Sequence, residues 1–295
     1  MRWKPIIFIA ALTVLSVPLA KFCLKQTGKF MMIEVHSRRP YNPDFETRPL
    51  TASETAEVNT ALAQKYTYFG YGGQAFVFFS EDGQYVLKLF KQRHFRQPTY
   101  LNHIPFIEEY RQLKFKKRDR LLRREYGSYK LAFEELQEES ALLFLHLNPT
   151  HHLKRKLTLV DKLNIEHSID LDTTDFIVQR RVSLVFDSIY LAMERGDTTS
   201  ARAVISEIVR LIVDRCKRGY GDRDPSIDTN CGILNGKAVK LDIGRLYHDP
   251  NRTLPLFYKP ELFHITRPLR TWLVKNHPEL VSHLDSEVNQ VIFHD

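Results

Sequence analysis

Residues 219–244 read Gly219-Tyr-Gly-Asp222-Arg223-Asp224-Pro-Ser-Ile-Asp-Thr-Asn230-Cys-Gly-Ile-Leu-Asn-Gly-Lys-Ala-Val-Lys240-Leu-Asp242-Ile-Gly244. Two short apolar runs, 232–234 and 238–241, flank the Asn-Gly pair at 235–236, which is the strongest two-residue signal for a hairpin turn. Acidic and amide side chains stand just before and just after this hairpin. The stretch therefore predicts that Asp224, Asn230 and Asp242 are held near the two ends of one β hairpin.

The composition is that of a folded protein. The chain has 295 residues, of which 43% are hydrophobic, and a formal net charge of +8, so disorder as the main state is excluded. This length allows one large or two modest domains. Cys23, Cys216 and Cys231 have no C-x-x-C spacing, which excludes a disulfide scaffold and a zinc ribbon.

The apolar patterns in the rest of the chain predict both strands and helices. An antiparallel meander of strands at 66–70, 75–80 and 84–90 has a turn signal at Asp82-Gly83. Helical spacing predicts helices over 129–147 and 200–216. We also expect strands at 157–163 and 176–180, and a short helix that begins with the capping box Thr51-Ala-Ser-Glu54.

A glycine-rich turn lies between the first two strands of the meander. Phe69–Val77 fits G-x-G-x-x-G-x-V with Gly70, Gly72, Ala75 in place of the third glycine, and Val77. Small residues here let backbone N–H groups approach phosphate oxygens, which a β-carbon would obstruct. A strand follows the turn and not a helix, so dinucleotide binding of the Rossmann type is excluded. Lys88 stands in the next apolar strand, where a charge needs a partner or an anionic ligand.

The order of these motifs resembles the protein kinase-like superfamily. The glycine-rich turn, Lys88, the segment from Gly219 to Asn230, and Asp242-Ile-Gly244 follow one another as that family's four signatures do. The resemblance covers about residues 66–247. It implies an α+β, two-lobed fold with an antiparallel sheet in an N-lobe (51–180) and a reduced helical C-lobe (181–295), preceded by an apolar N-terminal helix.

The resemblance also implies roles for individual residues and two cofactors, ATP and Mg²⁺. Asp224 would be the catalytic base, Lys88 would hold the nucleotide phosphates, and Asn230 and Asp242 would ligate magnesium. An acid from the long helix would pair with Lys88. We expect this acid to be Glu139, with Glu135 next because it lies one turn away on the same edge.

Several departures from the family pattern keep the activity open. Asp222 replaces the histidine of H-R-D, Ser226 stands where Ser/Thr kinases have Lys, and the loop from Asp224 to Asn230 is one residue longer. An insertion of about forty residues (91–130) precedes the long helix, and no A-P-E follows Asp242. We expect an ATP- and Mg²⁺-dependent phosphotransferase. The alternatives are a pseudokinase that binds nucleotide or a partner without turnover, and a structural membrane-associated domain.

The N-terminus predicts contact with a membrane. Pro5–Ala20 is a run of sixteen uncharged residues between basic flanks, and it spans a bilayer only if Phe22 to Leu24 join it. An uncleaved anchor through residues 5–24 is favoured over a cleaved signal peptide, because Pro18 is poor for cleavage after Ala20. We expect an anchor or signal segment at 1–28, a linker at 29–50, a kinase-like domain at 51–295, and a protein that is membrane-associated or exported.

A basic segment lies at residues 111–130. It carries nine Lys or Arg against two acids. We expect a solvated helical face, and the two alternatives are a surface for anionic lipid and a nucleic-acid site. The sequence names no protein partner. A metal site at His146, His151 and His152 is disfavoured because no acid or Cys lies at ligand spacing.

Overall fold

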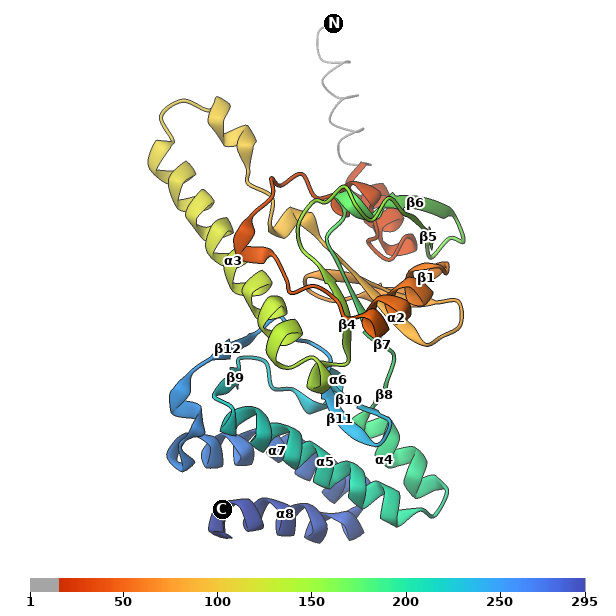
Figure 1. The fold of residues 1–295 in the computed structure, drawn as a ribbon, viewed down its shortest axis with the longest axis vertical. Coiled ribbons are helices and arrows are strands. Elements are labelled where there is room, and N and C mark those ends of the chain that lie inside the picture. The colour runs from red at the N-terminus through yellow and green to blue at the C-terminus, as the bar shows by residue number, and fades with distance from the viewer. Residues whose placement is uncertain (1–15, 295) are drawn as a thin grey trace, which may run out of the picture. The chain divides into compact units, whose positions relative to one another are not determined.

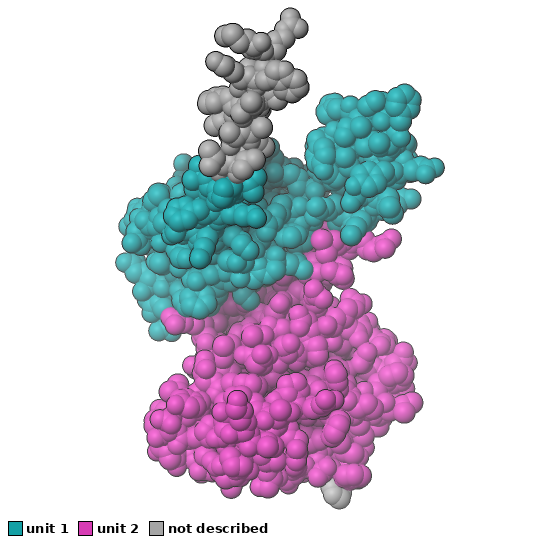
Figure 2. All heavy atoms as spheres, turned by 180° about the vertical axis from the view of Figure 1, so that it is seen from behind, with its two compact units in different colours: residues 1–42, 51–118, 146–178 teal, residues 43–50, 119–145, 179–295 magenta. Residues whose placement is uncertain are grey.

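The computed structural model describes residues 16–294 and has a mixed α+β fold (Figure 1). The chain divides into two compact units (Figure 2). Unit 1 contains residues up to 42 together with 51–118 and 146–178, and unit 2 contains 43–50, 119–145 and 179–295. The chain therefore passes several times from one unit to the other.

The meander at the centre of unit 1 agrees with its prediction. β1 (Tyr66–Tyr71), β2 (Ala75–Ser80) and β3 (Tyr85–Phe90) pair antiparallel in sequence order. Side chains of β2 alternate, so Phe76 and Phe78 are fully buried while their neighbours are not. The turn before β3 contains Gly83 with a positive φ of 71°, as its Asp-Gly signal predicts.

Four more strands extend this sheet to seven. They are β4 (Leu142–His146), β5 (Lys156–Val160), β6 (Glu166–Asp170) and β7 (Phe176–Arg180), and the strand order is β4-β7-β3-β2-β1-β5-β6. The hairpin of β5 and β6 adds to the sheet through a parallel pairing of β5 with β1. Short 3₁₀ turns join these strands and their neighbours: η3 (Gln92–His94), η4 (Thr99–His103) and η6 (Leu171–Thr173).

The segment before the first predicted helix packs on the sheet of unit 1. Residues 16–26 are helical, and η1 (Met32–Glu34) follows. Phe30, in the expected linker, is 5% exposed, and its ring lies edge-on to those of Phe76 and Phe78 at centroid distances of 5.2 and 5.3 Å. Apolar contact thus holds part of residues 29–50 against the core. α2 (Ala52–Leu62) starts with both halves of the predicted capping box.

The predicted apolar N-terminal helix lies mostly outside the described residues, since residues 5–15 of that run precede them. Between residues 16 and 294, no helix has the length and hydropathy needed to cross a bilayer. The expected anchor at 5–24 therefore stays a prediction.

The prediction of one helix over residues 129–147 is wrong in its second half. α3 runs from Glu108 to Glu135, and η5 (Glu138–Ser140) and strand β4 follow it. Ala141 takes a left-handed φ of 52°, which ends the helical path. The apolar run at Leu142–Leu145 has no clear period, and such short runs suit a buried strand as well as a helix. α3 also contains the whole basic segment, residues 111–130.

Helices form most of unit 2. They are α4 (Val185–Glu194), α5 (Thr198–Lys217), α7 (Pro255–Asn276) and α8 (Val281–His294), with η2 (Pro43–Phe45), η7 (Pro250–Thr253) and η8 (Pro278–Leu280) as short turns. α5 matches its predicted range and buries one stripe, with Ala201, Ile205 and Ile208 fully covered. The stripe packs with α4, α7 and α8 in one apolar core.

The small strands of unit 2 surround the stretch quoted first. β10 (Cys231–Leu234) and β11 (Lys237–Lys240) form the predicted hairpin, and Asn235 and Gly236 both have positive φ. β8 (Ser183–Leu184) pairs with β10, and β9 (Tyr220–Asp222) pairs with β12 (Leu246–His248). α6 (Ile227–Asn230) is a single turn of helix between β9 and β10.

Candidate functional site

The glycine-rich turn of unit 1 is open around its glycines. Gly72 N–H donates to the Ala75 carbonyl over 2.9 Å and so closes the turn between β1 and β2. The pairing register shifts between Tyr68 and Gly70, which marks a bulge. A β-carbon built on Gly70 or Gly72 would meet no atom within 4 Å. The fold therefore does not require glycine at these two positions for space, which leaves room for a ligand to approach the backbone.

Lys88 lies on β3, next to this turn. It pairs across the strands with Val77 and is partly buried, while its neighbours Leu87 and Leu89 are fully buried on the other face of the strand. The structure thus places Gly70, Gly72, Ala75, Val77 and Lys88 on three adjacent strands and the turn between two of them. This is the part of the predicted site that unit 1 supplies.

Lys91 is a residue of this region that sequence reasoning missed. Its side chain is only 2% exposed, and its Nζ donates to the Gly72 carbonyl over 2.6 Å. The ammonium also lies over the rings of Tyr71 and Phe76, at 4.6 and 5.0 Å from their centroids. Burial, together with the positive charge of Arg93, lowers the pKa of Lys91 to about 8. The bond from Lys91 to the Gly72 carbonyl therefore helps to hold the glycine-rich turn in place.

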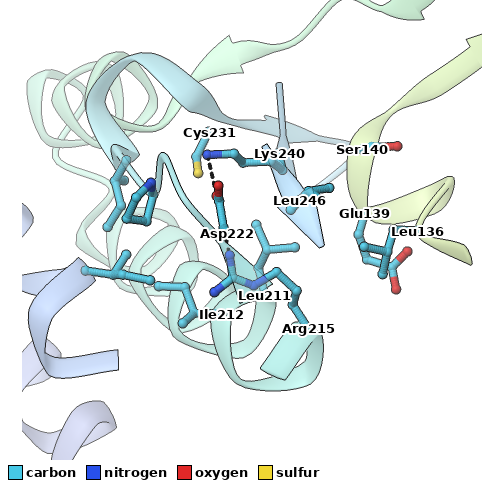
Figure 3. Close-up of a pocket in the computed structure, with 13 residues that line it drawn as sticks. Leu136, Glu139, Ser140, Leu211, Ile212, Arg215, Asp222, Cys231, Lys240 and Leu246 are labelled. Atoms are coloured by element: carbon cyan, nitrogen blue, oxygen red, sulfur yellow. Dashed lines mark ion pairs between the residues drawn. The ribbon is translucent and has the colours of Figure 1, made fainter. Parts of the chain in front are cut away.

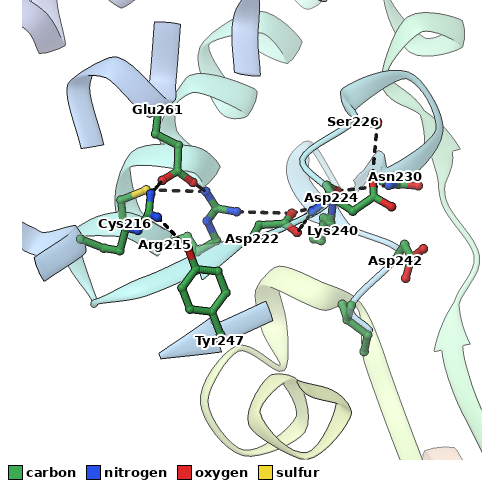
Figure 4. Close-up of polar contacts among 12 residues, drawn as sticks. Arg215, Cys216, Asp222, Asp224, Ser226, Asn230, Lys240, Asp242, Tyr247 and Glu261 are labelled. Atoms are coloured by element: carbon green, nitrogen blue, oxygen red, sulfur yellow. Dashed lines mark hydrogen bonds and ion pairs between the residues drawn. The ribbon is translucent and has the colours of Figure 1, made fainter. Parts of the chain in front are cut away.

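In unit 2, Asp224 and Asn230 belong to one loop. The Asn230 amide donates to the Asp224 carbonyl over 3.3 Å, across the turn of α6 (Figure 4). The Asp224 backbone N–H donates to a carboxylate oxygen of Asp222 over 2.8 Å, which fixes the other end of the loop. α6 lies within this loop, and the bond from Asn230 to Asp224 closes it.

Asp242 joins this pair through the hairpin. The Leu241 N–H donates to the Asn230 carbonyl over 2.7 Å. Asp242, the next residue in the chain, therefore lies close to Asn230. Its side chain is exposed and accepts from the Gly244 N–H over 3.2 Å. Figure 4 shows Asp224, Asn230 and Asp242 on adjoining segments. The structure thus brings together the three predicted residues of unit 2.

A buried cluster of charged side chains contacts this loop. The Asp222 carboxylate, 1% exposed, accepts from Lys240 Nζ over 2.7 Å and lies 3.4 Å from Arg215 (Figure 4). Lys240 Nζ also donates to the Asp224 carbonyl over 2.5 Å, and Arg215 donates to Glu261 of α7 over 2.5 Å. Asp222 stands where the family has a histidine, and here its contacts are ionic.

A small cavity lies beside this cluster (Figure 3). Its volume is about 30 Å³, and its lining is mainly apolar. The polar residues of the lining are Glu139, Ser140, Arg215, Asp222 and Lys240. Such a volume suits one or two water molecules and is far too small for a nucleotide base. The cavity is therefore a packing feature of unit 2 and not the ligand site.

The structure places Glu139 away from the expected helix. Glu139 lies in η5, and its carboxylate pairs with Arg218, at the end of α5. The prediction that it projects from the long helix is therefore wrong, since α3 ends at Glu135. Whether Glu139 pairs with Lys88 stays untested.

Glu125 is the carboxylate of α3 that sequence reasoning missed. It is fully buried, its Oε1 accepts from Arg124 over 2.6 Å, and its Oε2 has no hydrogen-bond partner among residues 16–294. A β-carbon on Gly244 would come within 2.8 Å of that Oε2, so Glu125 lies beside the Asp242-Ile-Gly segment. A usable signal was its helical spacing with Tyr129, another buried residue of α3.

The remaining candidates are structural. His146 is buried, with Nδ1 at 2.7 Å from the Thr174 carbonyl and Nε2 at 3.1 Å from the Thr150 hydroxyl. Over the described part of the chain, no group of three or more His, Cys, Asp or Glu is placed to hold a metal ion.

No family model matches the chain, and no curated protein matches it by sequence. Solved structures similar to it include the bifunctional kinase-methyltransferase WbdD, with 14% identity, a TM-score of 0.36, and coverage of 77% of this chain and 46% of WbdD. The ROP18 kinase domain in complex with AMP-PNP and sucrose has 16% identity, a TM-score of 0.35, and coverage of 83% and 84%. A complex of Rv3197 with erythromycin, from Mycobacterium tuberculosis, has 14% identity, a TM-score of 0.33, and coverage of 81% and 60%.

The chain thus spans less than half the length of WbdD. Kinase-like proteins are among the solved structures that this chain is similar to.

Proposed function

We propose that the protein is an ATP- and Mg²⁺-dependent phosphotransferase of kinase-like fold. The observation that carries the proposal is the contact of Asn230 with the Asp224 carbonyl, together with the backbone bond from Leu241 to Asn230. These two contacts bring one candidate base and two candidate magnesium ligands to adjoining segments.

The donor set of unit 2 fits a magnesium ion bound with its nucleotide. Mg²⁺ prefers hard oxygen ligands, and in phosphotransfer sites it takes one or two from the protein and the rest from water and phosphate. Asp242 would supply a carboxylate oxygen, and Asn230 would supply its amide oxygen, since its amide nitrogen already donates to Asp224. The metal would offset phosphate charge, while Asp224 would accept the proton of the attacking hydroxyl.

Unit 1 would hold the nucleotide phosphates. Lys88 supplies a positive charge, and the open space beside Gly70 and Gly72 would let a phosphate group approach the backbone of the turn.

A pseudokinase is the second candidate. The feature that favours it is the loop from Asp224 to Asn230, because its one extra residue relative to the kinase pattern can change how the loop presents a base to the substrate. Nucleotide binding would then persist without turnover.

The first experiment measures nucleotide binding by thermal shift of the full-length protein. ATP with Mg²⁺ at 100 times its Kd should stabilise the native state by about 2.7 kcal/mol. If millimolar ATP with Mg²⁺ leaves the melting temperature unchanged, both the phosphotransferase and the nucleotide-binding pseudokinase are excluded.

The second experiment compares three matched substitutions in a phosphotransfer assay. Asp224→Asn should lower the rate by roughly 10²- to 10⁴-fold with nearly unchanged ATP affinity, because the base meets the substrate hydroxyl. Asp242→Asn should weaken Mg²⁺-ATP binding itself. Asp228→Asn, an exposed acid of the same loop, is the control and should change neither quantity.

The outcomes of this comparison separate the two candidates. A wild type that binds Mg²⁺-ATP but neither hydrolyses ATP nor phosphorylates itself, with Asp224→Asn indistinguishable from it, would replace the enzyme by the pseudokinase. If Asp222→Asn abolishes turnover in a stable protein while Asp224→Asn does not, the base is Asp222.

We also propose that residues 5–24 attach the protein to a membrane. The support is the uncharged run between basic flanks, which suits a lipid bilayer with polar headgroups on both sides. Carbonate extraction should leave the full-length chain in the membrane fraction. Recovery in the supernatant, with an intact N-terminus by mass spectrometry, would contradict this proposal.

A further inference from the structure

The connection from η4 to α3 carries an exposed apolar tip in unit 1. Phe106 is fully exposed at 105% and has a left-handed φ of 62°, at the turn just before α3. Bulky residues rarely adopt this backbone conformation, and a Phe whose ring is fully exposed gains no packing that would offset its cost. Four further exposed apolar residues surround the turn in sequence: Tyr100, Ile104, Tyr110 and Leu113.

Basic residues lie directly behind this tip. Lys116 and Lys117 belong to the first half of α3, where Lys117 is exposed, and Lys114 lies over the ring of Tyr110 at 5.0 Å. A groove of about 540 Å³ between η4 and α3 is lined by Arg111 and Lys116 among others. The acids Glu108 and Glu109 are fewer than the cations, so the tip is positively charged as a whole.

We propose that this tip, residues 100–118, inserts its apolar side chains into an anionic membrane surface. The combination of exposed aromatic residues with lysines and arginines fits the interface of an anionic bilayer, where rings enter the headgroup layer and cations meet lipid phosphates. A protein groove would match the apolar residues, but it would have to bury or pair the surrounding cations as well. Charge complementarity therefore favours lipid.

The position of the tip within unit 1 agrees with this proposal. The helix at residues 16–26 and the tip both lie towards the same end of unit 1 (Figure 1), and Figure 2 shows the projection of unit 1 at that end. Residues 16–24 belong to the proposed membrane attachment, on which this inference partly rests. Attachment there would keep the tip at the membrane, so that weak insertion suffices.

The test places a fluorescent reporter at the tip of the full-length protein in lipid nanodiscs. Trp3→Phe removes a tryptophan near the proposed anchor, and Phe106→Trp adds one at a fully exposed site, where it disturbs no packing. The control adds the tryptophan by Phe263→Trp, at an exposed position of α7. Both variants keep Trp272, so its emission is common to them. Emission is compared in discs with brominated phosphatidylserine, with brominated phosphatidylcholine, and without bromine.

We expect the emission of the Phe106→Trp variant to shift to the blue and to be quenched in discs that contain brominated phosphatidylserine. The Phe263→Trp variant should show neither effect. Lys116→Glu with Lys117→Glu should abolish the quenching of the reporter at position 106, whereas Lys275→Glu, an exposed residue of α7, should not. High salt should act like the lysine variants, because the Debye length falls to about 3 Å at 1 M.

Three results would overturn the inference, and they differ in what else they exclude. Chains that enter the discs but leave the reporter at position 106 unquenched in phosphatidylserine would exclude docking of the tip and leave the anchor at 5–24 intact. Chains that associate with no disc would exclude both. Quenching in both lipids, insensitive to the lysine variants, would show apolar insertion without recognition of anionic lipid, contrary to the proposal.

Discussion

The two halves of the candidate site use glycine for opposite reasons. In unit 1, a β-carbon on Gly70, Gly72 or Gly73 would meet no atom within 4 Å. In unit 2, a β-carbon on Gly232 would lie 2.2 Å from Val182 Cγ2, and one on Gly244 would lie 2.7 Å from the Tyr129 hydroxyl. The first region leaves space beside its backbone, while the second fills that space with its own side chains.

The same contrast holds for buried charge. In unit 1, Lys91 holds the turn through the Gly72 carbonyl and two aromatic rings. In unit 2, carboxylates and cations alternate in a connected cluster around Asp222. The glycine-rich turn is thus open beside its backbone, whereas the acidic loop is fixed by several ionic contacts. The following predictions test this difference, beginning with the largest expected effect.

The cluster in unit 2 should be sensitive to loss of one carboxylate. Asp222→Asn leaves Lys240 buried without an anionic partner, and removing one member of a buried ion pair typically costs about 3–5 kcal/mol. Urea denaturation should show this loss. Glu166→Gln is the control: it breaks an exposed pair with Lys65 in unit 1 and should leave the midpoint unchanged.

A double substitution separates lost charge from lost packing. Asp222→Leu with Lys240→Met should recover much of the stability, because replacing both partners by apolar groups removes the unpaired charge. If the double variant is no more stable than Asp222→Asn, then the cluster acts through its shape and not through its charges.

Alanine at the two kinds of glycine should shift stability in opposite directions. Gly232→Ala drives a methyl group towards the Ser183 carbonyl, 2.8 Å away in the paired strand, and should cost about 1–3 kcal/mol. Gly72→Ala meets no neighbour and has no positive φ, so it should raise stability by about 0.4–1 kcal/mol. If Gly232→Ala and Gly72→Ala change the melting temperature equally, the two regions do not differ in how tightly they pack around their glycines.

The Gly72→Ala variant should also bind Mg²⁺-ATP more weakly if the turn receives phosphate. Titration calorimetry on this stable variant would detect the change. Unchanged affinity would mean that the open space beside Gly72 is not used by the nucleotide.

Lys91 should give the stability of the protein a pH dependence in the alkaline range. Its pKa is about 8 in the folded chain against 10.5 in a model compound, so between these values the unfolded state binds more protons. Stability contributed by Lys91 therefore rises as the pH increases from about 8 towards 10.5. The stability of wild type relative to Lys91→Met, measured by urea unfolding, should grow over this window. A difference that stays flat or falls would show that the pKa of Lys91 is not depressed in the folded chain.

Much of the fold was predictable because its signals are local. The hairpin turn at Asn235-Gly236, the capping box at Thr51 and the stripe of α5 each depend on residues within a short stretch of chain. The strand β4 was not predictable. Leu142–Leu145 is apolar throughout, and whether it forms a strand or a helix depends on pairing with a strand distant in sequence.

The residues of the candidate site were likewise only partly predictable from the sequence. Asp224, Asn230 and Asp242 were found from order and spacing, and they do meet in unit 2. Lys91 and Glu125 were missed, because a lysine after a strand and a glutamate in a basic helix look solvated in sequence. The structure shows that both are buried, at 2% and 0% exposed, and in the sequence only the helical spacing of Glu125 with Tyr129 hints at this.

The sequence by itself determined the residue types of the site and the elements that carry them, since turn chemistry, hairpin spacing and polar residues beside apolar strands act over short distances along the chain. Tertiary structure alone decided which charges are buried and which partner each one has. Asp222 joins Lys240 and Arg215, and Glu139 joins Arg218, through contacts between segments separated in sequence. Burial strengthens such pairs and penalises an unpaired charge, so the choice of partner follows the packing and cannot be read from local pattern.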